Sequence, residues 1–405
     1  MELTSRILGD ICDEVGGIIR TGPFGSQLHE SDYKESGIPV VMPKNILAGV
    51  ISTEDIAYIG DNDANRLSQH RLKRGDIVYG RRGDIGRRAL ITVRQSGWLC
   101  GTGCIRISLS DSVLDPGFLY YYLGQPNVIE WIYNQAIGAT LPNLNTAIIR
   151  SIPIEYPPLP TQRKIAANLS AYDDLIENNT RRIKILKEMA QALYREWFVH
   201  FRFPGHEKVR MVDSPLGRIP EGWEAATLDK VIRFQNGRAV EVDDQGKFPL
   251  YGSNGVIGKT IDSRYHNGIV IGRVGAYCGS TFCCKSEFCA SDNTIVAQAI
   301  SEDLLCTELI YYILKNIDLG RNASGSAQPL LTQNVLKKIP VLIPDNIANK
   351  VFKNFLKSVN DEIINLYDRI NNLQLTRDCL LPKLISGEFD VSDLDIEILN
   401  GAYYG

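Results

Sequence analysis

The chain has 405 residues, of which 44% are hydrophobic and 22% are charged, and its formal net charge is −3. These values are ordinary for a soluble protein of two or three domains, and they do not by themselves suggest a nucleic-acid partner. No apolar run reaches the roughly eighteen residues of a transmembrane helix, and the first residues lack the apolar core of a signal peptide. We therefore expect a cytoplasmic protein whose nine cysteines are reduced thiols.

Residues 1–158 are predicted to form a first globular part. A glycine-rich turn at residues 20–26 is followed by short β-type runs that alternate with turns. A helix-like stretch rich in tyrosine follows at residues 116–123. This mixture indicates a β-rich α/β domain.

Basic residues are concentrated between residues 66 and 94, where nine of them accompany only two acidic residues, Asp76 and Asp84. A local basic cluster on a nearly neutral chain fits contact with phosphates, and it fits a solvated charged face equally well. The nine are Arg66, Arg71, Lys73, Arg74, Arg81, Arg82, Arg87, Arg88 and Arg94.

A long amphipathic helix is predicted over residues 163–199, within a segment that spans 159–205. Pro160 excludes a helix before Thr161, which can serve as the N-cap, and Pro204 stops the helix. Its length of about 55 Å predicts lengthwise packing against an equally long partner. Apolar residues recur every three or four positions, with one double step at Asn179-Thr180: Ile165, Leu169, Tyr172, Ile176, Ile183, Leu186, Ala190, Leu193 and Trp197.

The partner is encoded in the same chain, because the sequence around this helix matches itself without a gap after a shift of 187 residues. Residues 206–345 repeat the plan of the first globular part, residues 346–389 repeat the long helix, and 390–405 form a tail. The second stripe includes positions seven apart, which is the coiled-coil period. Its residues are Phe352, Val359, Ile363, Leu366, Ile370, Leu373 and Leu380.

Five segments resemble one family, the specificity subunits of type I DNA restriction-modification systems. The helical segments are LPTQRKIAANL at 159–169, DLIENNTRRIKILKEMAQALYREWF at 174–198 and LLPKLISGEFDV at 380–391. The loop segments GPFGS at 22–26 and IVYGRRGDIG at 77–86 are also similar to that family's recognition domains. The resemblance covers nearly the whole chain, and the helical segments are its specific part.

The resemblance implies an α+β fold in which two β-rich target-recognition domains are separated by two long helices. Those helices would form an antiparallel coiled coil with pseudo-twofold symmetry and would dock two methyltransferase subunits, with restriction subunits as further partners. Each domain would read one half of a split, asymmetric DNA target. Half-sites read from one face of a duplex lie roughly 34 Å apart, or a multiple of that distance.

Candidate DNA contacts lie on glycine turns and among the basic residues. Glycine permits close approach, arginine suits guanine or phosphate, and asparagine and glutamine suit adenine, although the same residues are common in ordinary turns. The tyrosine runs at 120–122 and 311–312 are expected in the core, and the cysteine spacings argue against zinc. The candidate contacts are Thr21, Gly22, Phe24, Gly25, Ser26, Gln27, Lys44, Asn45, Arg81, Arg82, Arg87, Arg88, Asn236, Arg238, Ser253, Asn254, Lys259, Arg273 and Lys285.

Catalytic motifs are missing from the sequence. Tyr156-Pro157-Pro158 is the only approach to a methyltransferase motif, and no nucleotide-binding glycine loop occurs. We therefore expect a non-catalytic subunit with no bound cofactor and no metal, and S-adenosylmethionine on the methyltransferase partner. Two alternatives are a specificity subunit whose single partner both cuts and methylates, and a coiled-coil scaffold with no DNA role.

Overall fold

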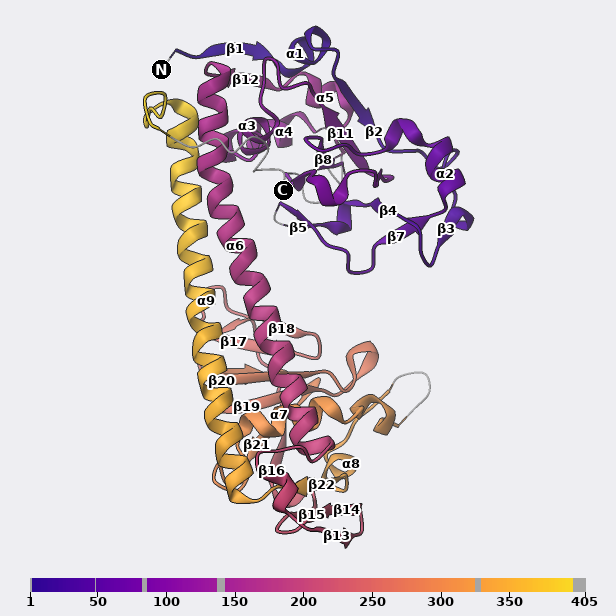
Figure 1. Ribbon diagram of the computed structural model, residues 1–405, viewed down its shortest axis with the longest axis vertical. Coiled ribbons are helices and arrows are strands. Elements are labelled where there is room, and N and C mark those ends of the chain that lie inside the picture. Colours follow the sequence, from indigo (N-terminus) through magenta and orange to yellow (C-terminus); the bar gives the residue numbers. More distant parts are fainter. Residues whose placement is uncertain (1, 48, 82–85, 137–142, 325–328, 396–405) are drawn as a thin grey trace. The chain divides into compact units, whose positions relative to one another are not determined.

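The computed structural model describes residues 2–47, 49–81, 86–136, 143–324 and 329–395 (Figure 1). The chain divides into two compact units. Unit 1 comprises residues 1–179 and 368–405, and unit 2 comprises residues 180–367. Within the described ranges, none of the helices combines the length and the apolar character that a membrane span requires.

Unit 1 contains two four-stranded sheets and two strand pairs. One sheet has the order β2 (Ile18–Thr21), β11 (Cys104–Ser108), β8 (Ile77–Gly80), β9 (Arg88–Leu90). The other has the order β10 (Leu99–Cys100), β4 (Ile38–Val41), β7 (Ala57–Ile59), β3 (Tyr33–Lys34), and β10 runs parallel to β4. The pairs are β1 (Thr4–Ile7) with β12 (Pro153–Tyr156), and β5 (Ile46–Leu47) with β6 (Val50–Ile51).

Five short helices complete the β-rich part of unit 1: α1 (Leu8–Glu14), α2 (Asp61–Arg66), α3 (Pro116–Tyr122), α4 (Pro126–Gln135) and α5 (Thr146–Arg150). The core joins α3 and the first sheet to residues from both long helices. Ile165 and Leu169 pack there with Leu384 and Ile385, so residues more than two hundred positions apart close one core.

Unit 2 repeats this plan with longer strands. Its six-stranded sheet has the order β16 (Ile232–Asn236), β21 (Thr294–Ala299), β19 (Tyr265–Gly272), β20 (Thr281–Ala290), β17 (Phe248–Gly252), β18 (Gly255–Thr260). Two strand pairs flank it, β13 (Met211–Ser214) with β14 (Gly217–Pro220) and β15 (Glu224–Thr227) with β22 (Pro340–Ile343). The short helices are α7 (Thr307–Asn316) and α8 (Gln333–Lys337).

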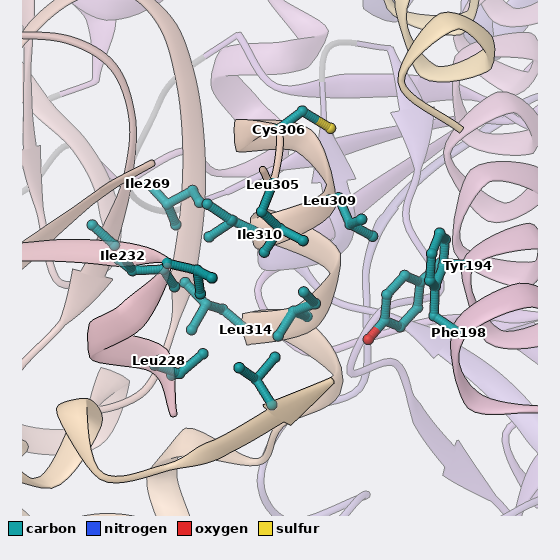
Figure 2. Packing of buried hydrophobic residues seen from close by; sticks show 14 of the residues in the cluster. Tyr194, Phe198, Leu228, Ile232, Ile269, Leu305, Cys306, Leu309, Ile310 and Leu314 are labelled. Carbon is teal, nitrogen blue, oxygen red and sulfur yellow. The ribbon is translucent and has the colours of Figure 1, made fainter. Parts of the chain in front are cut away.

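The core of unit 2 forms around α7. Figure 2 shows Ile310 of this helix directed toward Ile232 and Ile269 of the sheet, while Tyr194 and Phe198 face α7 from the opposite side. Aromatic rings extend this core, because Phe352 lies between Trp197 and Tyr312 with ring centroids 5.7 and 6.3 Å away.

The long helices are α6 (Leu159–Tyr194), which continues into one π-helical turn at Arg195–Val199, and α9 (Asn346–Ser386). Our prediction for the start of α6 was wrong, because the helix begins two residues before Thr161. Pro160 occupies its second position, where the missing N–H has no helical partner to lose. The carboxylate of Asp345 accepts a hydrogen bond from the Ala348 N–H (2.7 Å) at the start of α9.

Within each unit the two long helices run in opposite directions. In unit 1, Lys164 donates to the carbonyl of Ser392 (2.6 Å) and Asp173 pairs with Arg377. In unit 2, Arg182 pairs with Glu362 (2.8 Å), and Trp197 lies against Phe352. In both cases the residue number on or just after α9 falls as the number along α6 and its π-helical turn rises, which is antiparallel packing.

The predicted stripe residues lie on the packed faces of these helices. Ile165, Leu169 and Leu366 are fully buried, and Ile183, Trp197 and Val359 are nearly so. Ala190 and Phe352 are fully buried as well. The others are partly buried: Tyr172, Ile176, Leu186, Leu193, Ile363, Ile370, Leu373 and Leu380.

Candidate nucleic-acid interface

Four connections of unit 1 meet at the ends of β2, β4, β8 and β11, and we call this region loop cluster 1. It comprises residues 22–27, 41–45, 80–81 and 101–104. Backbone hydrogen bonds join the four connections, and the Thr102 hydroxyl adds a bond to the carbonyl of Pro23 (2.8 Å). Its turns are therefore fixed to the end of the sheet rather than loosely attached.

The corresponding strands of unit 2 carry loop cluster 2, which comprises residues 237–238, 251–254, 272–273 and 291–294. Ser253 ties two of its connections together through a hydroxyl bond to the carbonyl of Asn293 (2.7 Å). The Asn236 side chain lies beside it, within hydrogen-bond distance of Gln333 (2.8 Å).

The same five backbone hydrogen bonds hold both clusters. Their lengths agree to within 0.2 Å, although the sequences of the loops differ. In loop cluster 1 the backbone N–H of the first residue of each pair donates to the carbonyl of the second: Gly22 to Cys104 (2.9 Å), Arg81 to Gly103 (2.8 Å), Leu144 to Arg81 (3.0 Å), Gly101 to Val41 (2.9 Å) and Cys104 to Gly101 (3.2 Å). In loop cluster 2 the pairs are Gly237 to Thr294 (3.0 Å), Arg273 to Asn293 (2.9 Å), Leu331 to Arg273 (2.9 Å), Ser291 to Tyr251 (2.8 Å) and Thr294 to Ser291 (3.0 Å).

These bonds pair the residues of the two clusters one by one. Arg81 corresponds to Arg273, Gly22 to Gly237 and Leu144 to Leu331, so three of the bonded positions keep their residue. The exposed tips differ. Thr102 lies between the bonded residues Gly101 and Gly103, where Asp292 lies between Ser291 and Asn293, and Lys44 and Asn254 each lie three residues after the bonded residues Val41 and Tyr251. The strand residues 77–81 therefore correspond to residues 269–273.

The exposed surface of loop cluster 1 contains aromatic, cationic and hydroxyl groups. The ring of Phe24 is 52% exposed, and the guanidinium of Arg81 lies 5.9 Å from its centre. Gly25, Ser26 and Lys44 are exposed on the neighbouring turns. Such a mixture suits both phosphate oxygens and base edges.

On loop cluster 2 the exposed groups are different. Arg238 and Asn254 are exposed beside the acidic Asp292, and Tyr277 is 58% exposed on the turn that follows Arg273. Lys259 is exposed on β18. A carboxylate on this surface cannot bind phosphate but can accept a hydrogen bond from an amino group of a base.

Several side chains that were predicted to contact DNA form hydrogen bonds within the fold. The buried side chain of Asn45 accepts from the Met42 N–H (3.0 Å), and Gln27 accepts from the Phe24 N–H (3.3 Å). Arg88 donates to the carbonyl of Tyr120 (2.8 Å) and stacks on its ring. Gly22 is buried, and Thr21 is half-buried at the end of β2.

Lys285 is also committed within unit 2, because it forms an ion pair with Glu308 (2.6 Å). Burial of Glu308 opposes its ionisation, but the bond to Lys285 lowers the pKa of this carboxyl below its usual value. Arg82 lies outside the described residues, and Arg87 is exposed.

Three of the basic residues between 66 and 94 that the structure describes also form bonds within unit 1. Arg66 donates to the carbonyl of Gln27 (2.7 Å), Arg71 to that of Gly97 (3.2 Å), and Arg94 pairs with Glu177 (3.1 Å). These guanidinium groups tie turns and α6 together.

The tyrosine and cysteine predictions concern the core. Tyr121 and Tyr122 are buried as predicted, and the hydroxyl of Tyr121 donates to Asp173 (2.6 Å). All nine cysteines are free thiols, and Cys283 and Cys284 are neighbours in β20. Burial raises the pKa of Cys283 to about 12.

Replacing Gly22 by alanine should destabilise unit 1 by about 1–3 kcal/mol. A Cβ at this position would overlap the carbonyl oxygen of Gly101, which is held by the hydrogen bonds of loop cluster 1. Urea unfolding measures the change. Gly25→Ala is the matched control, since nothing lies within 4 Å of its Cβ; equal losses for both variants would contradict the close packing at Gly22.

The two units thus carry the same loop frame beneath different exposed tips, which defines a protein built by internal duplication. A model of the type I restriction modification DNA specificity domain matches residues 5–188 and 220–375. The chain therefore belongs to this family, and its role is DNA recognition rather than catalysis.

Curated relatives agree with this membership. The type I restriction enzyme MjaIX specificity subunit of Methanocaldococcus jannaschii is 24% identical over 400 residues, covering 90% of this chain and 89% of that one. The HindI specificity subunit of Haemophilus influenzae is 24% identical over 404 residues, covering 78% and 87%. The fold resembles a crystal structure of the type I restriction-modification S subunit from M. genitalium, with a TM-score of 0.56, 17% identity and 95% and 96% coverage.

Sequence reasoning missed two exposed tip residues, Thr102 and Asp292. Thr102 lies between β10 and β11 in the sequence Gly-Thr-Gly, and Asp292 lies between β20 and β21 in the sequence Ser-Asp-Asn. The turn composition was visible in the sequence, but only the shared hydrogen bonds show that the two turns correspond.

Proposed function

We propose that each unit reads one half of a split, asymmetric DNA target. The observation that carries this proposal is the loop frame of five backbone hydrogen bonds, which occurs in both units beneath different exposed side chains. Two equivalent platforms suit two sites on one duplex, and different tips suit two different base sequences. The long helices would set the spacer between the two halves.

Recognition would combine two kinds of contact. Arginine and lysine around the clusters would bind phosphates, which gives an affinity that falls with salt. Polar tips such as Lys44, Asn254 and Asp292 would reach base edges in a groove, where hydrogen-bond patterns distinguish the bases.

The helices would also hold two methyltransferase subunits, which would bind S-adenosylmethionine and modify the DNA, and restriction subunits would join this assembly. All of these components would meet in the cytoplasm. The stripe residues are a poor docking surface, because they are turned into the protein. Exposed apolar pairs one turn apart are better suited: Ile185 and Met189 are 47% and 51% exposed on α6, and Ile347 and Val351 are 76% and 45% exposed on α9.

Replacing Ile185 and Met189 together by glutamate should reduce capture of the co-expressed methyltransferase at least tenfold. Charges at these positions would have to be desolvated in a docked interface, whereas both side chains are exposed in the unbound chain. Affinity pull-down with quantification of the bound subunit gives the measurement. Asn178→Glu, an exposed position on the same helix, should leave capture unchanged; undiminished capture by the double variant would remove this docking site from the proposal.

The function is tested by single-molecule sequencing of methylated adenines in host DNA with and without the gene. A split motif that disappears on deletion supports the proposal and supplies both half-sites and the spacer. If the active methyltransferase partner is present and the motif is unaffected by deletion, the proposal fails.

A further inference from the structure

Arg81 and Arg273 occupy the same place in the two loop clusters. In each case the backbone N–H donates to a turn residue, Gly103 or Asn293, and the carbonyl accepts from a leucine, Leu144 or Leu331. Each arginine is half-buried and follows the last residue of a central strand, β8 or β19. The two units thus present one guanidinium group each from an equivalent backbone position.

Neither guanidinium has a hydrogen-bond acceptor for all of its N–H groups among the described residues. Arg81 uses only Nε, which donates to the carbonyl of Leu144 (2.7 Å), so its two terminal nitrogens have no hydrogen-bond acceptor among the described residues. The Nε of Arg273 is buried, and none of the described residues accepts its hydrogen bond. A buried donor without an acceptor costs free energy unless a ligand supplies one.

The tips beside these arginines differ in chemistry. Lys44 is cationic where Asn254 is an amide, and Thr102 is a hydroxyl where Asp292 is a carboxylate. Asp292 would repel a phosphate. On a DNA-binding surface its carboxylate can therefore contact only a base amino group. Lysine suits the acceptors of guanine, asparagine suits adenine, and aspartate suits the amino group of cytosine.

We infer that Arg81 and Arg273 bind DNA phosphates equivalently at the two half-sites, while Lys44 with Thr102 and Asn254 with Asp292 select the bases. This inference rests on the proposed function. Phosphates are the same at every DNA sequence, so both loop clusters can keep the arginine that binds them. The tip residues that read bases differ between the two clusters because the two half-sites differ in sequence. Guanine is assigned to Lys44, adenine to Asn254 and cytosine to Asp292.

The full-length protein with its methyltransferase partner is titrated with a duplex carrying the motif mapped by methylation sequencing, over a range of salt concentrations. Arg81→Gln and Arg273→Gln should each weaken binding about tenfold and reduce the slope of log affinity against log salt by about 1, with the base preference unchanged. Lysine at either position should restore the slope. Thermal unfolding of each variant checks that the loop cluster is intact.

Asp292→Asn and Lys44→Ala form the second arm, read by selection from duplexes randomised at one half-site. Each should relax preference in one half of the target only, with the salt slope for Asp292→Asn unchanged. An arginine variant that changes base preference, or that keeps the full slope, overturns the assignment. A wild-type complex that ignores every duplex at moderate salt would instead refute the proposed function.

Discussion

Replacing Phe352 by alanine should lower the free energy of unfolding by about 3–5 kcal/mol. This side chain is fully buried, and its ring lies 4.8 Å from that of Phe198 and 5.7 Å from that of Trp197, centre to centre. Alanine would leave a cavity where α6, α7 and α9 meet. Urea unfolding followed by tryptophan fluorescence is the suitable measurement, because Trp197 lies beside the substituted ring.

Ile347→Ala provides the control for this experiment. It removes an apolar side chain from the same helix, but Ile347 is 76% exposed, so the expected change is below about 0.5 kcal/mol. Similar losses for the two variants would show that the aromatic cluster does not hold unit 2 together.

Replacing Gln162 by leucine should cost about 3 kcal/mol or more, because three buried backbone groups would lose their partners. The amide nitrogen donates to the carbonyls of Val113 (3.0 Å) and Pro157 (2.9 Å), and the amide oxygen accepts from the Asp115 N–H (2.7 Å). Gln162 is fully buried in α6, so water cannot replace these bonds. Chemical denaturation of unit 1 measures the loss.

The repeat supplies an internal comparison. Asn349 is the counterpart of Gln162 on α9. Its amide nitrogen donates to the carbonyls of Asp303 (3.1 Å) and Leu304 (3.2 Å), but its amide oxygen has no donor among the described residues. Asn349→Leu should therefore cost less than Gln162→Leu, and the exposed Gln135→Leu should cost almost nothing. The reverse order would mean that these amide bonds are not what fixes the helices to the sheets.

The long helices were predictable because their apolar spacing is periodic and their repeat has no gaps. Near the start of α6 the rule against proline misled us, because Pro160 is compatible with the first turn of a helix. Composition could not show that the helix begins at Leu159 instead of after Thr161. Local sequence leaves such boundaries open, and tertiary packing decides them.

The loop clusters were harder to predict from the sequence, because corresponding loops of the two globular parts differ in length. Equivalent residues are 187 positions apart at Leu144 and Leu331, but 215 apart at Gly22 and Gly237. A fixed shift therefore aligns the helices and fails for the turns. Likewise, no property of the sequence distinguishes Arg88, which is bonded to Tyr120, from an arginine that faces solvent.

The division of the chain into units has a consequence for biosynthesis. Unit 2 is one continuous segment, whereas the core of unit 1 includes Leu381, Leu384 and Ile385 near the end of α9. Domains are usually finished in the order in which the ribosome makes them. In this chain unit 1 is synthesised first but completed last, after all of unit 2 has left the ribosome. A nascent chain released before residue 368 would lack part of the core of unit 1, so the two loop clusters are both fully supported only in a completed polypeptide.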